Sequence, residues 1–322
     1  MVGYDGMKTC VVLVNYAGAA DTQNCVRSLL ACPVHPGLVV VDNTPNDPQL
    51  EDAVAGYPDA KIIRAPENLG FGRGNNLGMV WALANTDCEF IFVLNNDAAV
   101  EPDTIARLES VLENQPQTGI AAPRIVFMDR PDVLWYGGGE VSWLRGGGIT
   151  PGVLGPSNTA LAMQAREVSF ASGCAMLVRR DLLEQLGGFD ERLFMYEEDV
   201  ELCLRTVELG WKIRYEPSAL VTHVVQASSR GEQEFVGMLS PLNKNLSFYA
   251  YHLVRNRLIN MRLHAKGVNR QVFNVGFSML LFKKLVSFAL HGRWDGIAAM
   301  IKGWRSYRAC FMRGDNKGAV AI

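Results

Sequence analysis

Residues 90–97 read Phe-Ile-Phe-Val-Leu-Asn-Asn-Asp, which is five apolar residues followed by three polar ones. An apolar run of this length is typical of a strand covered on both faces, as the strands of a parallel sheet are. The same pattern occurs at residues 11–16, which read Val-Val-Leu-Val-Asn-Tyr, and at residues 38–43, which read Leu-Val-Val-Val-Asp-Asn. Ligands of open α/β sheets bind at the carboxyl ends of the strands. The polar ends of these three segments therefore indicate a ligand site.

Strand-like and helix-like stretches alternate through the first hundred residues, which predicts right-handed βαβ units. The expected elements are strands over residues 8–14, 37–42, 61–64 and 89–94, and helices over residues 19–30 and 74–84. Farther along we expect helices over 102–113 and 199–209, a helix that begins at Asp181, and strands over 211–215 and 219–224. The predicted fold class is α/β and Rossmann-like, with a mostly parallel central sheet and flanking helices.

Two glycine-rich turns, at residues 137–139 and 146–148, interrupt this pattern. They lie near Trp135 and Trp143, and they predict a hairpin or a mobile loop that borders a substrate. A polar loop is expected over residues 226–234.

The formal net charge of −2 is a cancellation between two unlike parts of the 322-residue chain. Residues 241–322 contain fourteen Lys and Arg against two acids, a net charge of +12, whereas residues 1–240 carry −14. We therefore divide the chain into a domain over 1–240 that holds the ligand site and a basic, helical region over 241–322. Helix is expected there because apolar side chains recur at spacings of four, three and four: Leu242, Leu246, Tyr249 and Leu253.

The basic region also contains a series of apolar side chains on one helical face. They are Phe273, Phe277, Leu281, Leu285 and Phe288, with Trp294, Trp304, Tyr307 and Phe311 beyond them. Together with the positive charge, this pattern suits an interfacial region on an anionic membrane. The alternative is that these side chains pack on the rest of the protein, while the basic residues form a solvated face or bind an acidic partner. No nucleic-acid module accompanies the charge, so nucleic acid is not an expected partner.

The ends of the chain and its cysteines favour a cytoplasmic protein. The apolar run from Cys10 to Val14 is too short for a secretory signal, and the run over 272–282 falls short of the ~20 residues of a spanning helix. The seven cysteines include no C-x-x-C pair, and several have apolar neighbours. Reduced, buried thiols are therefore expected, and a structural zinc site is not.

Three groups of residues are candidates for chemistry, and each also has an ordinary structural explanation. Asp97 follows a strand, where its carboxylate either binds a hard divalent cation or caps a turn. His223 lies among apolar residues, either as a core histidine or as a ligand of a Mn²⁺-type ion. Glu197, Glu198 and Asp199 stand at the start of a helix, where they pair with the helix dipole or supply a general base whose proton affinity is raised by burial.

A glycine-rich segment over residues 68–78 precedes a predicted helix, where glycines allow a phosphate to approach the backbone closely. Its Gly70, Gly72 and Gly74 lack the G-x-G-x-x-G spacing, and no such element follows the first strand, which disfavours a dinucleotide-binding dehydrogenase. Neither a P-loop nor a G-x-S-x-G motif is present.

Seven short motifs follow one another along the chain. They are Val11-Val-Leu-Val-Asn-Tyr16, Val40-Val-Asp42-Asn43, Glu67-Asn-Leu-Gly-Phe71, Leu94-Asn-Asn-Asp97, Gly187-Gly-Phe-Asp-Glu191, Glu198-Asp-Val-Glu-Leu-Cys-Leu-Arg205 and His223. In this order they resemble the family 2 glycosyltransferases, in particular the bacterial rhamnosyltransferase-like and galactofuranosyltransferase-like enzymes. The resemblance covers about residues 8–225, and Arg255-Asn256-Arg257 is similar to a motif that often follows in this subgroup.

The resemblance implies a GT-A fold, and transfer of a sugar with inversion from a nucleoside diphosphate sugar in the presence of Mg²⁺ or Mn²⁺. By position it implies Asp199 as the catalytic base and Asp97 and His223 as metal ligands. The residues it assigns to the nucleotide sugar are Tyr16, Asp42, Gly70, Arg73, Asn75 and Asn96, with Asp42 accepting the imide N–H of a uracil or thymine. The residues it assigns to the acceptor side are Trp135, Gly173 and Glu198.

Four positions depart from the family pattern. Asn95 and Asn96 replace acids of the D-x-D motif, which leaves one carboxylate for the metal and implies a modest cation affinity. Ala17 stands where Asn is usual and Pro45 where Ser is common, which leaves the nucleotide contacts at these two positions open.

The leading hypothesis is transfer from a dTDP- or UDP-activated sugar, such as dTDP-L-rhamnose, to a polyprenyl-linked glycan acceptor. This would occur in bacterial surface polysaccharide synthesis, on the inner face of the plasma membrane. Two other classes are weighed. A sugar nucleotidyltransferase would need a glycine-rich, basic loop after its first strand, which is absent. An inactive nucleotide- or carbohydrate-binding scaffold is suggested by the reduced D-x-D motif. The donor sugar, the linkage and the oligomeric state, including a homo-oligomer, stay open.

Overall fold

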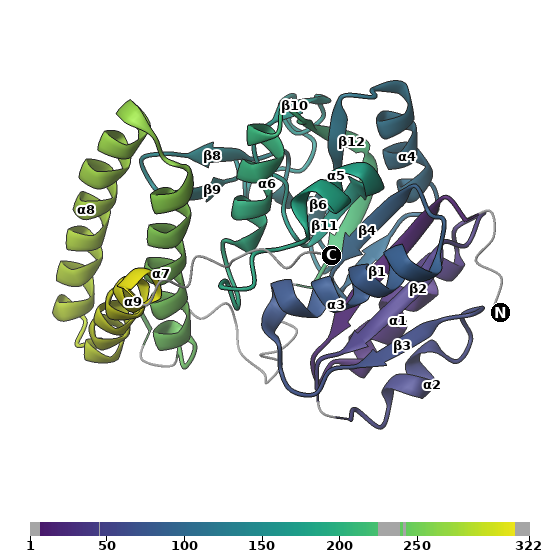
Figure 1. Cartoon of the computed structure of the whole chain (residues 1–322), viewed down its shortest axis with the longest axis horizontal. Helices are drawn as coiled ribbons and strands as arrows, with labels where there is room; N and C mark the ends of the chain where they lie inside the picture. The colour runs from purple at the N-terminus through teal and green to yellow at the C-terminus, as the bar shows by residue number, and fades with distance from the viewer. Residues whose placement is uncertain (1–6, 45, 225–238, 241–242, 313–322) are drawn as a thin grey trace.

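The computed structural model describes residues 7–44, 46–224, 239–240 and 243–312 of the chain (Figure 1). Within these residues a ten-stranded sheet has the order β10-β12-β6-β11-β4-β1-β2-β3, with β5 paired to β12 and β7 to β6. Its strands are β1 Thr9–Asn15, β2 Gly37–Asp42, β3 Lys61–Arg64, β4 Phe90–Leu94, β5 Ala98–Val100, β6 Thr118–Phe127, β7 Leu134–Tyr136, β10 Arg166–Val168, β11 Ala175–Arg179 and β12 Lys212–His223. A separate hairpin consists of β8 Glu140–Ser142 and β9 Gly147–Ile149.

Helices flank this sheet, and three more stand together at one end of the molecule (Figure 1). Those around the sheet are α1 Ala19–Leu30, α2 Leu50–Val54, α3 Gly70–Asn85, α4 Thr104–Asn114, α5 Arg180–Leu186 and α6 Glu198–Glu208. Those at the end are α7 Leu246–His264, α8 Gly267–Leu290 and α9 Trp294–Met312. The predicted α/β class with a helical C-terminal region is confirmed. Leu242 and the loop expected over 226–234 lie outside the described residues.

The first half of the sheet is parallel, as its apolar sequences predict. β1 pairs in parallel with β2 and with β4, and β2 with β3. β2 and β4 are buried along their whole length, as strands covered on both faces are. The register sets Asn15 opposite Asp42. The polar residues that follow the apolar runs therefore meet at one edge of the sheet.

The second half of the sheet departs from the sequence prediction. β11 runs antiparallel to both of its neighbours, β4 and β6. β6 was not predicted, because Gly119, two alanines and Pro123 dilute its apolar pattern. The strands expected over 211–215 and 219–224 are one strand, β12, whose pairing with β6 is irregular between Glu216 and Leu220.

The prediction for the two glycine-rich turns is confirmed, whereas the prediction for the glycine-rich segment is wrong. The turns at 137–139 and 146–148 border β8 and β9, so the predicted hairpin is confirmed. The segment at 68–78 was expected to precede a helix, but α3 already begins at Gly70. The glycines of this segment therefore lie within α3.

The C-terminal helices pack on the rest of the protein through apolar side chains that, from the sequence, were expected to face a membrane. Five of these are buried or half-buried: Phe273, Phe277, Leu281, Leu285 and Phe288. A Cβ on Gly146, in the turn of the β8–β9 hairpin, would meet the ring of Phe273 at 2.4 Å, and one on Gly296 of α9 would meet Phe288 at 2.9 Å. The expectation that these five residues face a membrane is therefore wrong, since they pack on the rest of the protein.

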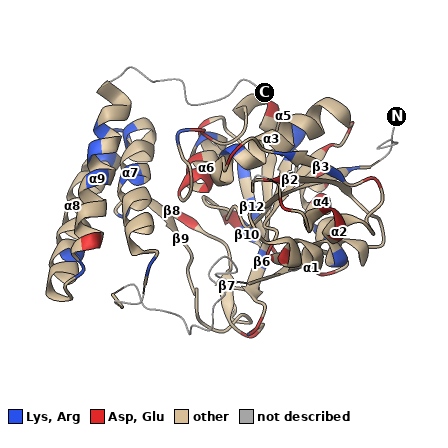
Figure 2. Cartoon of the chain, turned by 90° about the horizontal axis from the view of Figure 1, so that it is seen from below, with Lys and Arg blue, Asp and Glu red and all other residues tan. Residues whose placement is uncertain are grey.

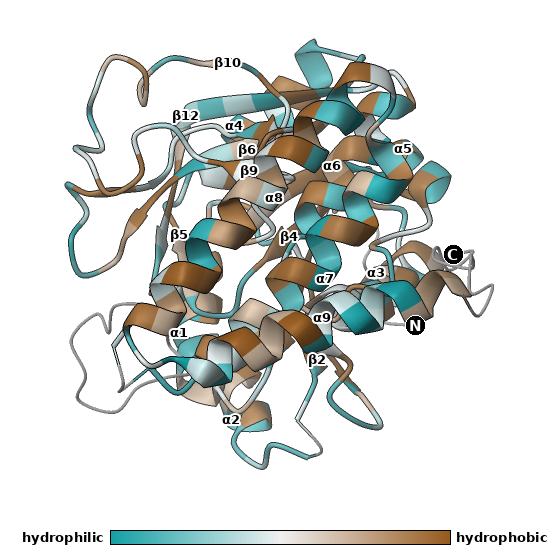
Figure 3. Ribbon diagram, turned by 90° about the vertical axis from the view of Figure 1, so that its left-hand side faces the viewer, coloured by the Kyte–Doolittle hydropathy of each residue, from teal (hydrophilic) through white to brown (hydrophobic). Residues whose placement is uncertain are grey.

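A different side of α8 is exposed, and we call it the outer face of α8. Its members recur at spacings of three and four: Val268, Val272, Val275, Met279, Phe282, Val286 and Leu290. Figure 3 looks onto this end of the molecule and shows the apolar segments of α8. The helix extends on both sides of the apolar run over 272–282, and by its length of 24 residues and its composition alone it is long and apolar enough to cross a membrane. The expectation that its apolar run is too short for a span is corrected accordingly.

All seven cysteines lie in the described part of the chain, and none forms a disulfide. Six are buried, and Cys310 on α9 is half-buried. Burial raises the pKa of the Cys10, Cys25 and Cys203 thiols, which keeps them protonated. The predicted burial of the thiols is confirmed for six of the seven.

An ion-pair network joins α6 to α7. His264 lies 3.3 Å from Glu201 (Nε2 to Oε1) and 3.1 Å from Glu208 (Nδ1 to Oε2), and Arg205 Nη2 lies 2.7 Å from Glu201 Oε2. Burial alone would lower the pKa of His264, but the hydrogen bond and the charge of Glu201, together with Glu208, raise it above the ordinary value of 6.5. The charged form of His264 therefore stabilises the folded state.

This network predicts a pH-dependent loss of stability in the His264→Gln variant. A raised pKa contributes stability that is fully present below the unfolded-state pKa and is lost as pH rises through the folded-state value. We expect the variant to lose about 1.5–3 kcal/mol at pH 6 and less at pH 9, because hydrogen bonds to charged groups have this strength. Thermal unfolding at both pH values measures the loss in the free energy of unfolding. His291→Gln, at an exposed position, is the control. Equal losses at pH 6 and pH 9 would contradict the prediction.

Candidate active site

The carboxyl ends of β4 and β12 bring Asp97 and His223 together. His223 stands opposite Ala98 in the pairing of β12 with β5, directly after Asp97. Oδ1 of Asp97 lies 3.0 Å from Nε2 of His223, and Nδ2 of Asn95 lies 3.5 Å from the same nitrogen. The fold therefore unites the two expected metal ligands, which lie 126 residues apart in the sequence.

Trp135 packs against the imidazole of His223. The two rings meet edge to face, with centroids 4.9 Å apart. Burial alone would lower the pKa of His223, but its contacts with Cys174 and with the Asp97 carboxylate raise it. Its Nδ1 has no hydrogen-bond partner among the described residues. Trp135, assigned to the acceptor side by the resemblance, thus lies beside the expected metal ligand.

The residues present fit a divalent cation that also takes ligands from its substrate. A carboxylate oxygen and an imidazole nitrogen suit Mn²⁺, and a carboxylate suits Mg²⁺. In the described ranges, no cluster of three or more His, Cys, Asp and Glu side chains is arranged to hold an ion. Mg²⁺ beside phosphates typically uses one or two carboxylates, the phosphates and water. The pair at Asp97 and His223 is compatible with that kind of site.

Asp199 lies in the first turn of α6, and backbone N–H groups fix its carboxylate. Gly173 donates to Oδ2 at 3.1 Å, and Val200 donates to Oδ1 at 2.8 Å. Burial raises the pKa of Asp199, and the two hydrogen bonds act in the opposite direction. Burial and the charge of Asp199 also raise the pKa of neighbouring Glu198, whose Oε2 has no hydrogen-bond partner among the described residues. Two backbone N–H groups stabilise the carboxylate of Asp199, which makes it the better suited of the two acids to accept a proton.

Residues 173 and 174 connect the surroundings of the metal pair with Asp199. Asn95 N–H donates to the carbonyl of Cys174 at 2.8 Å, while the N–H of the preceding Gly173 reaches Asp199. A Cβ on Gly173 would stand 3.0 Å from the ring of Phe71, so a glycine allows this close approach. Cys174 was missed in the sequence, because a cysteine in an apolar segment gives no local signal of a site.

The expected nucleoside side contains Asp42, Arg64 and Tyr16. Asp42 is fully buried, and its Oδ2 accepts the N–H of Asp47 at 3.0 Å and pairs with Nη1 of Arg64. Its Oδ1 accepts one bond, from the N–H of Thr44 at 3.1 Å, which leaves a lone pair for another donor. Tyr16 is 53% exposed, so its side chain is accessible to a ligand. Arg64 was not anticipated from the sequence.

Asn96 connects the end of β4 to the loop after β1. Its Nδ2 donates to Oγ1 of Thr22 at 3.0 Å and lies 3.4 Å from both Oδ1 of Asn15 and the carbonyl of Gly18. These contacts hold the loop that carries Tyr16. Asn96 therefore has a clear structural role beside the role expected for it in binding the donor.

The three candidate residues on α3 have different surroundings. Gly70 has a φ of 79°, and a Cβ there would stand 2.2 Å from the carbonyl oxygen of Phe194, so packing explains this glycine. Asn75 is buried and donates to the carbonyl of Phe71 at 3.0 Å, whereas its Oδ1 has no partner among the described residues. Arg73 is half-buried and has no hydrogen-bond or ion-pair partner in the described ranges.

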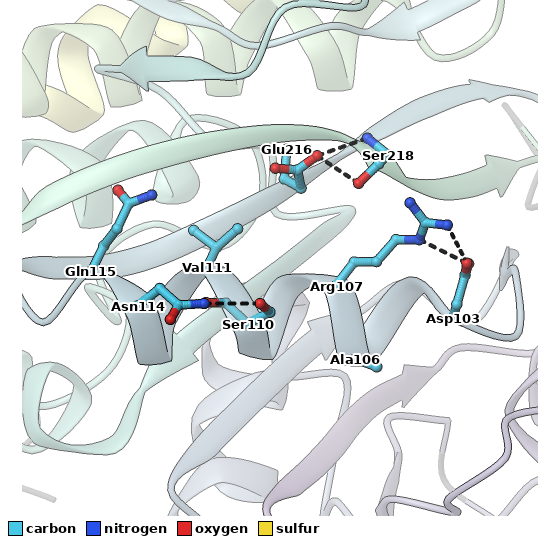
Figure 4. Close-up of a pocket in the computed structure, with 9 residues that line it drawn as sticks. All are labelled: Asp103, Ala106, Arg107, Ser110, Val111, Asn114, Gln115, Glu216 and Ser218. Atoms are coloured by element: carbon cyan, nitrogen blue, oxygen red, sulfur yellow. Dashed lines mark hydrogen bonds and ion pairs between the residues drawn. The ribbon is translucent and has the colours of Figure 1, made fainter.

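A surface depression between α4 and β12 is separate from these residues (Figure 4). Its polar side chains bind one another: Arg107 Nε lies 2.7 Å from Asp103 Oδ2, and Ser218 Oγ lies 2.6 Å from Glu216 Oε1. It contains none of the candidate residues, so it is not part of the site.

The comparisons with known proteins identify the family of the chain. Residues 8–235 match glycosyltransferase-like family 2, and the chain belongs to that family. It is 32% identical over 234 residues to the N-acetylglucosaminyl-diphospho-decaprenol L-rhamnosyltransferase of Mycobacterium tuberculosis, covering 66% of this chain and 75% of that one. It is 24% identical over 243 residues to the dTDP-rhamnosyl transferase RfbF of Shigella flexneri, covering 76% of each chain. The resemblance to a rhamnosyltransferase-like subgroup is confirmed.

A solved structure supports the fold alone. The mannosyltransferase PcManGT from Pyrobaculum calidifontis, in complex with GDP-Man and Mn²⁺, superposes with a TM-score of 0.55 at 14% sequence identity. The match covers 95% of this chain and 89% of that one. The GT-A architecture expected from the sequence is therefore confirmed.

Proposed function

We propose that this glycosyltransferase transfers a sugar, with inversion, from a dTDP- or UDP-activated donor to a glycan acceptor on a polyprenyl lipid. The product would be a precursor of a bacterial surface polysaccharide. The names of two relatives support this proposal, since one names a diphospho-decaprenol acceptor and the other a dTDP-rhamnosyl donor.

One observation carries the proposal: the short segment 173–174 contacts Asp199 through Gly173 and contacts Asn95, beside the Asp97–His223 pair, through Cys174. A sugar hydroxyl is a poor nucleophile at neutral pH, so a base must accept its proton. In the proposed reaction, Asp199 takes that proton as the hydroxyl oxygen bonds to the anomeric carbon. The bond from this carbon to the diphosphate oxygen breaks on the opposite face, which inverts the configuration.

Asp97 and His223 are the residues that would hold the cation. When bound, a divalent cation neutralises the charge that develops on the leaving diphosphate. Arg73 is suited to contact a phosphate, because its guanidinium has no partner among the described residues. Oδ1 of Asp42 and Oδ1 of Asn75 are acceptors with free capacity for the nucleoside.

The proposal is tested by a thermal-shift panel of UDP-, dTDP- and GDP-sugars, each with and without Mn²⁺ or Mg²⁺. We expect stabilisation by the UDP or dTDP compounds that increases with the cation. A preference for GDP would overturn the role of Asp42. Transfer to a lipid-diphosphate acceptor is then measured, and NMR of the product reports its anomeric configuration. Binding without turnover on any acceptor would favour the scaffold alternative.

We further propose that the outer face of α8 lies in the interface of an anionic membrane. Figure 2 shows Lys and Arg on the C-terminal helices and many of the acids around the sheet. On α9, Arg308 stands over the ring of Trp304 at 4.9 Å, and Trp294 is 66% exposed. Exposed tryptophans and basic residues beside an apolar stripe are typical of interfacial helices. An interfacial position suits α8 better than a span, because its other side is packed.

The membrane proposal predicts that Met279→Glu and Phe282→Glu each reduce binding to anionic liposomes at least about tenfold. Each change removes a side chain whose burial is worth about 1.5–3 kcal/mol, and 1.4 kcal/mol is a factor of ten. Flotation at low and at high salt measures binding. Asn274→Glu, at an exposed position off the outer face of α8, is the matched control. Failure of the unaltered protein to float at low salt, or equal losses in all three variants, would refute the proposal.

A further inference from the structure

The turn before α6 has a backbone conformation that side chains rarely adopt. Tyr196 and Glu197 have φ angles of 68° and 71°, in the left-handed region that disfavours residues other than glycine. Such conformations persist where the surrounding structure imposes them. α6 begins at the next residue, Glu198, and Asp199 follows. The direction in which Asp199 points therefore depends on whatever holds this turn.

α7 holds the turn through hydrogen bonds from its side chains to backbone carbonyls. The buried Asn256 donates from Nδ2 to the carbonyl of Met195 at 2.9 Å and to the carbonyl of Tyr196 at 2.8 Å. The buried Asn260 donates to the carbonyl of Glu197 at 2.9 Å. A side-chain amide has two N–H donors, so Asn256 uses its full donor capacity on this turn. Three consecutive carbonyls thus accept hydrogen bonds from two side chains of α7, and that of Glu197 also accepts the N–H of Glu201 at 3.1 Å.

Arg257 fixes the side chain of Glu197 in the same place. Its Nε lies 2.7 Å from Oε1 of Glu197, and its Nη1 lies 3.2 Å from the carbonyl of Arg145 in the β8–β9 hairpin. Gly147 of β9 packs over this ion pair, because a Cβ there would stand 2.5 Å from Oε2 of Glu197. The pair is covered by the hairpin, so Glu197 serves to anchor the turn.

We propose that Asn256 is a positioning residue for the base Asp199, acting with Asn260 on the turn of residues 195–197. The inference rests on the proposed catalytic role of Asp199. Its consequence is that α7, which lies within the basic region, completes the catalytic site, in addition to any contact of that region with a membrane. In this proposal, the central residue of the motif Arg255-Asn256-Arg257 is the one that holds the turn.

The test is Asn256→Ala, with Asn260→Ala as the second variant. We expect kcat to fall about 10²-fold in Asn256→Ala, since displacing a catalytic group by 1 Å has an effect of this size. The dissociation constant of the donor, measured with UDP or dTDP and Mn²⁺, should change less than about twofold, because no donor contact is altered. The acid limb of the kcat–pH profile should move to lower pH, because a loosened turn admits water to Asp199. Exposed Asn274→Ala is the matched control.

A rescue experiment separates positioning from general stability. Tyr196→Gly removes the penalty for a positive φ. In the Asn256→Ala background it should restore part of the lost kcat, whereas in the unaltered protein it should not raise kcat. Hydrogen exchange of the amides at 195–200 should accelerate in Asn256→Ala and slow again in the double variant.

Two outcomes overturn the proposal. One is an Asn256→Ala protein with unchanged kcat and unchanged exchange at 195–200. The other is a loss of donor binding and of the cooperative unfolding transition in both asparagine variants, which would show a general role in folding. Hydrogen exchange does not require turnover. If the unaltered protein transfers no sugar, the proposed function fails, while exchange still decides whether Asn256 holds the turn.

Discussion

Asp199→Asn is expected to lower kcat by about 10²–10⁴-fold, the usual contribution of a general base. Asparagine keeps the shape of the side chain, but its single oxygen can accept only one of the two hydrogen bonds that Gly173 and Val200 donate to separate carboxylate oxygens. It cannot take the proton of the acceptor hydroxyl. Initial rates of transfer measure the loss, and titration calorimetry with the nucleoside diphosphate and Mn²⁺ should show unchanged binding.

Two further variants make this test specific. Asp181→Asn alters an exposed acid in the first turn of α5 and should leave kcat unchanged. Glu198→Gln should have a smaller effect than Asp199→Asn, because burial and the charge of Asp199 favour the neutral form of Glu198. If Asp199→Asn retained more than a tenth of kcat while Glu198→Gln lost it, the base would be Glu198.

Asp97→Ala is expected to raise the half-saturating Mn²⁺ concentration at least about 100-fold. Loss of an outer-shell partner alone weakens metal binding 10–100-fold, and Asp97 is the one carboxylate of the proposed pair. The variant also removes the partner that His223 contacts at 3.0 Å. Electron paramagnetic resonance of Mn²⁺ in the presence of a nucleoside diphosphate measures binding without requiring turnover.

The matched control for Asp97→Ala is Asp103→Ala, which changes an exposed acid of the depression in Figure 4. It should leave the Mn²⁺ titration unchanged. Equal titration curves for Asp97→Ala and the unaltered protein would exclude Asp97 as a ligand.

Elements with a continuous apolar sequence and clear turn signals were predicted accurately. α1, β2 and β3 have the predicted bounds. β6 escaped prediction because its pattern is diluted by glycine, alanine and Pro123, and because its stability comes from β11 and β12, which are distant in sequence. Such pairing compensates for a weak local preference, and local patterns do not report it.

α8 shows a second limit of sequence patterns. Its inner side, with Phe273 and Phe277, and its outer face, with Met279 and Phe282, are both apolar at helical spacing. Periodicity alone cannot say which side packs. The positions of α7, α9 and the β8–β9 hairpin decide it, and these are properties of the tertiary structure.

The candidate site could be proposed from the sequence where distinctive residues are concentrated in short motifs. Asp97, Asp199 and His223 are chemically distinctive residues at the ends of elements, and the fold brings Asp97 and His223 into contact. Arg64 and Asn260 gave no comparable signal, because an arginine or an asparagine is common on any surface. Their roles depend on partners that approach from elsewhere in the chain.

The distribution of the thiols makes the protein suitable for selective labelling without engineering. Six cysteines are buried, and Cys310 is half-buried on α9, the helix that also carries Trp294 and Trp304. A maleimide fluorophore should therefore react first at Cys310 in the folded protein. A dye attached there would report on the polarity around α9, so its emission could follow the docking of the helices onto vesicles in real time.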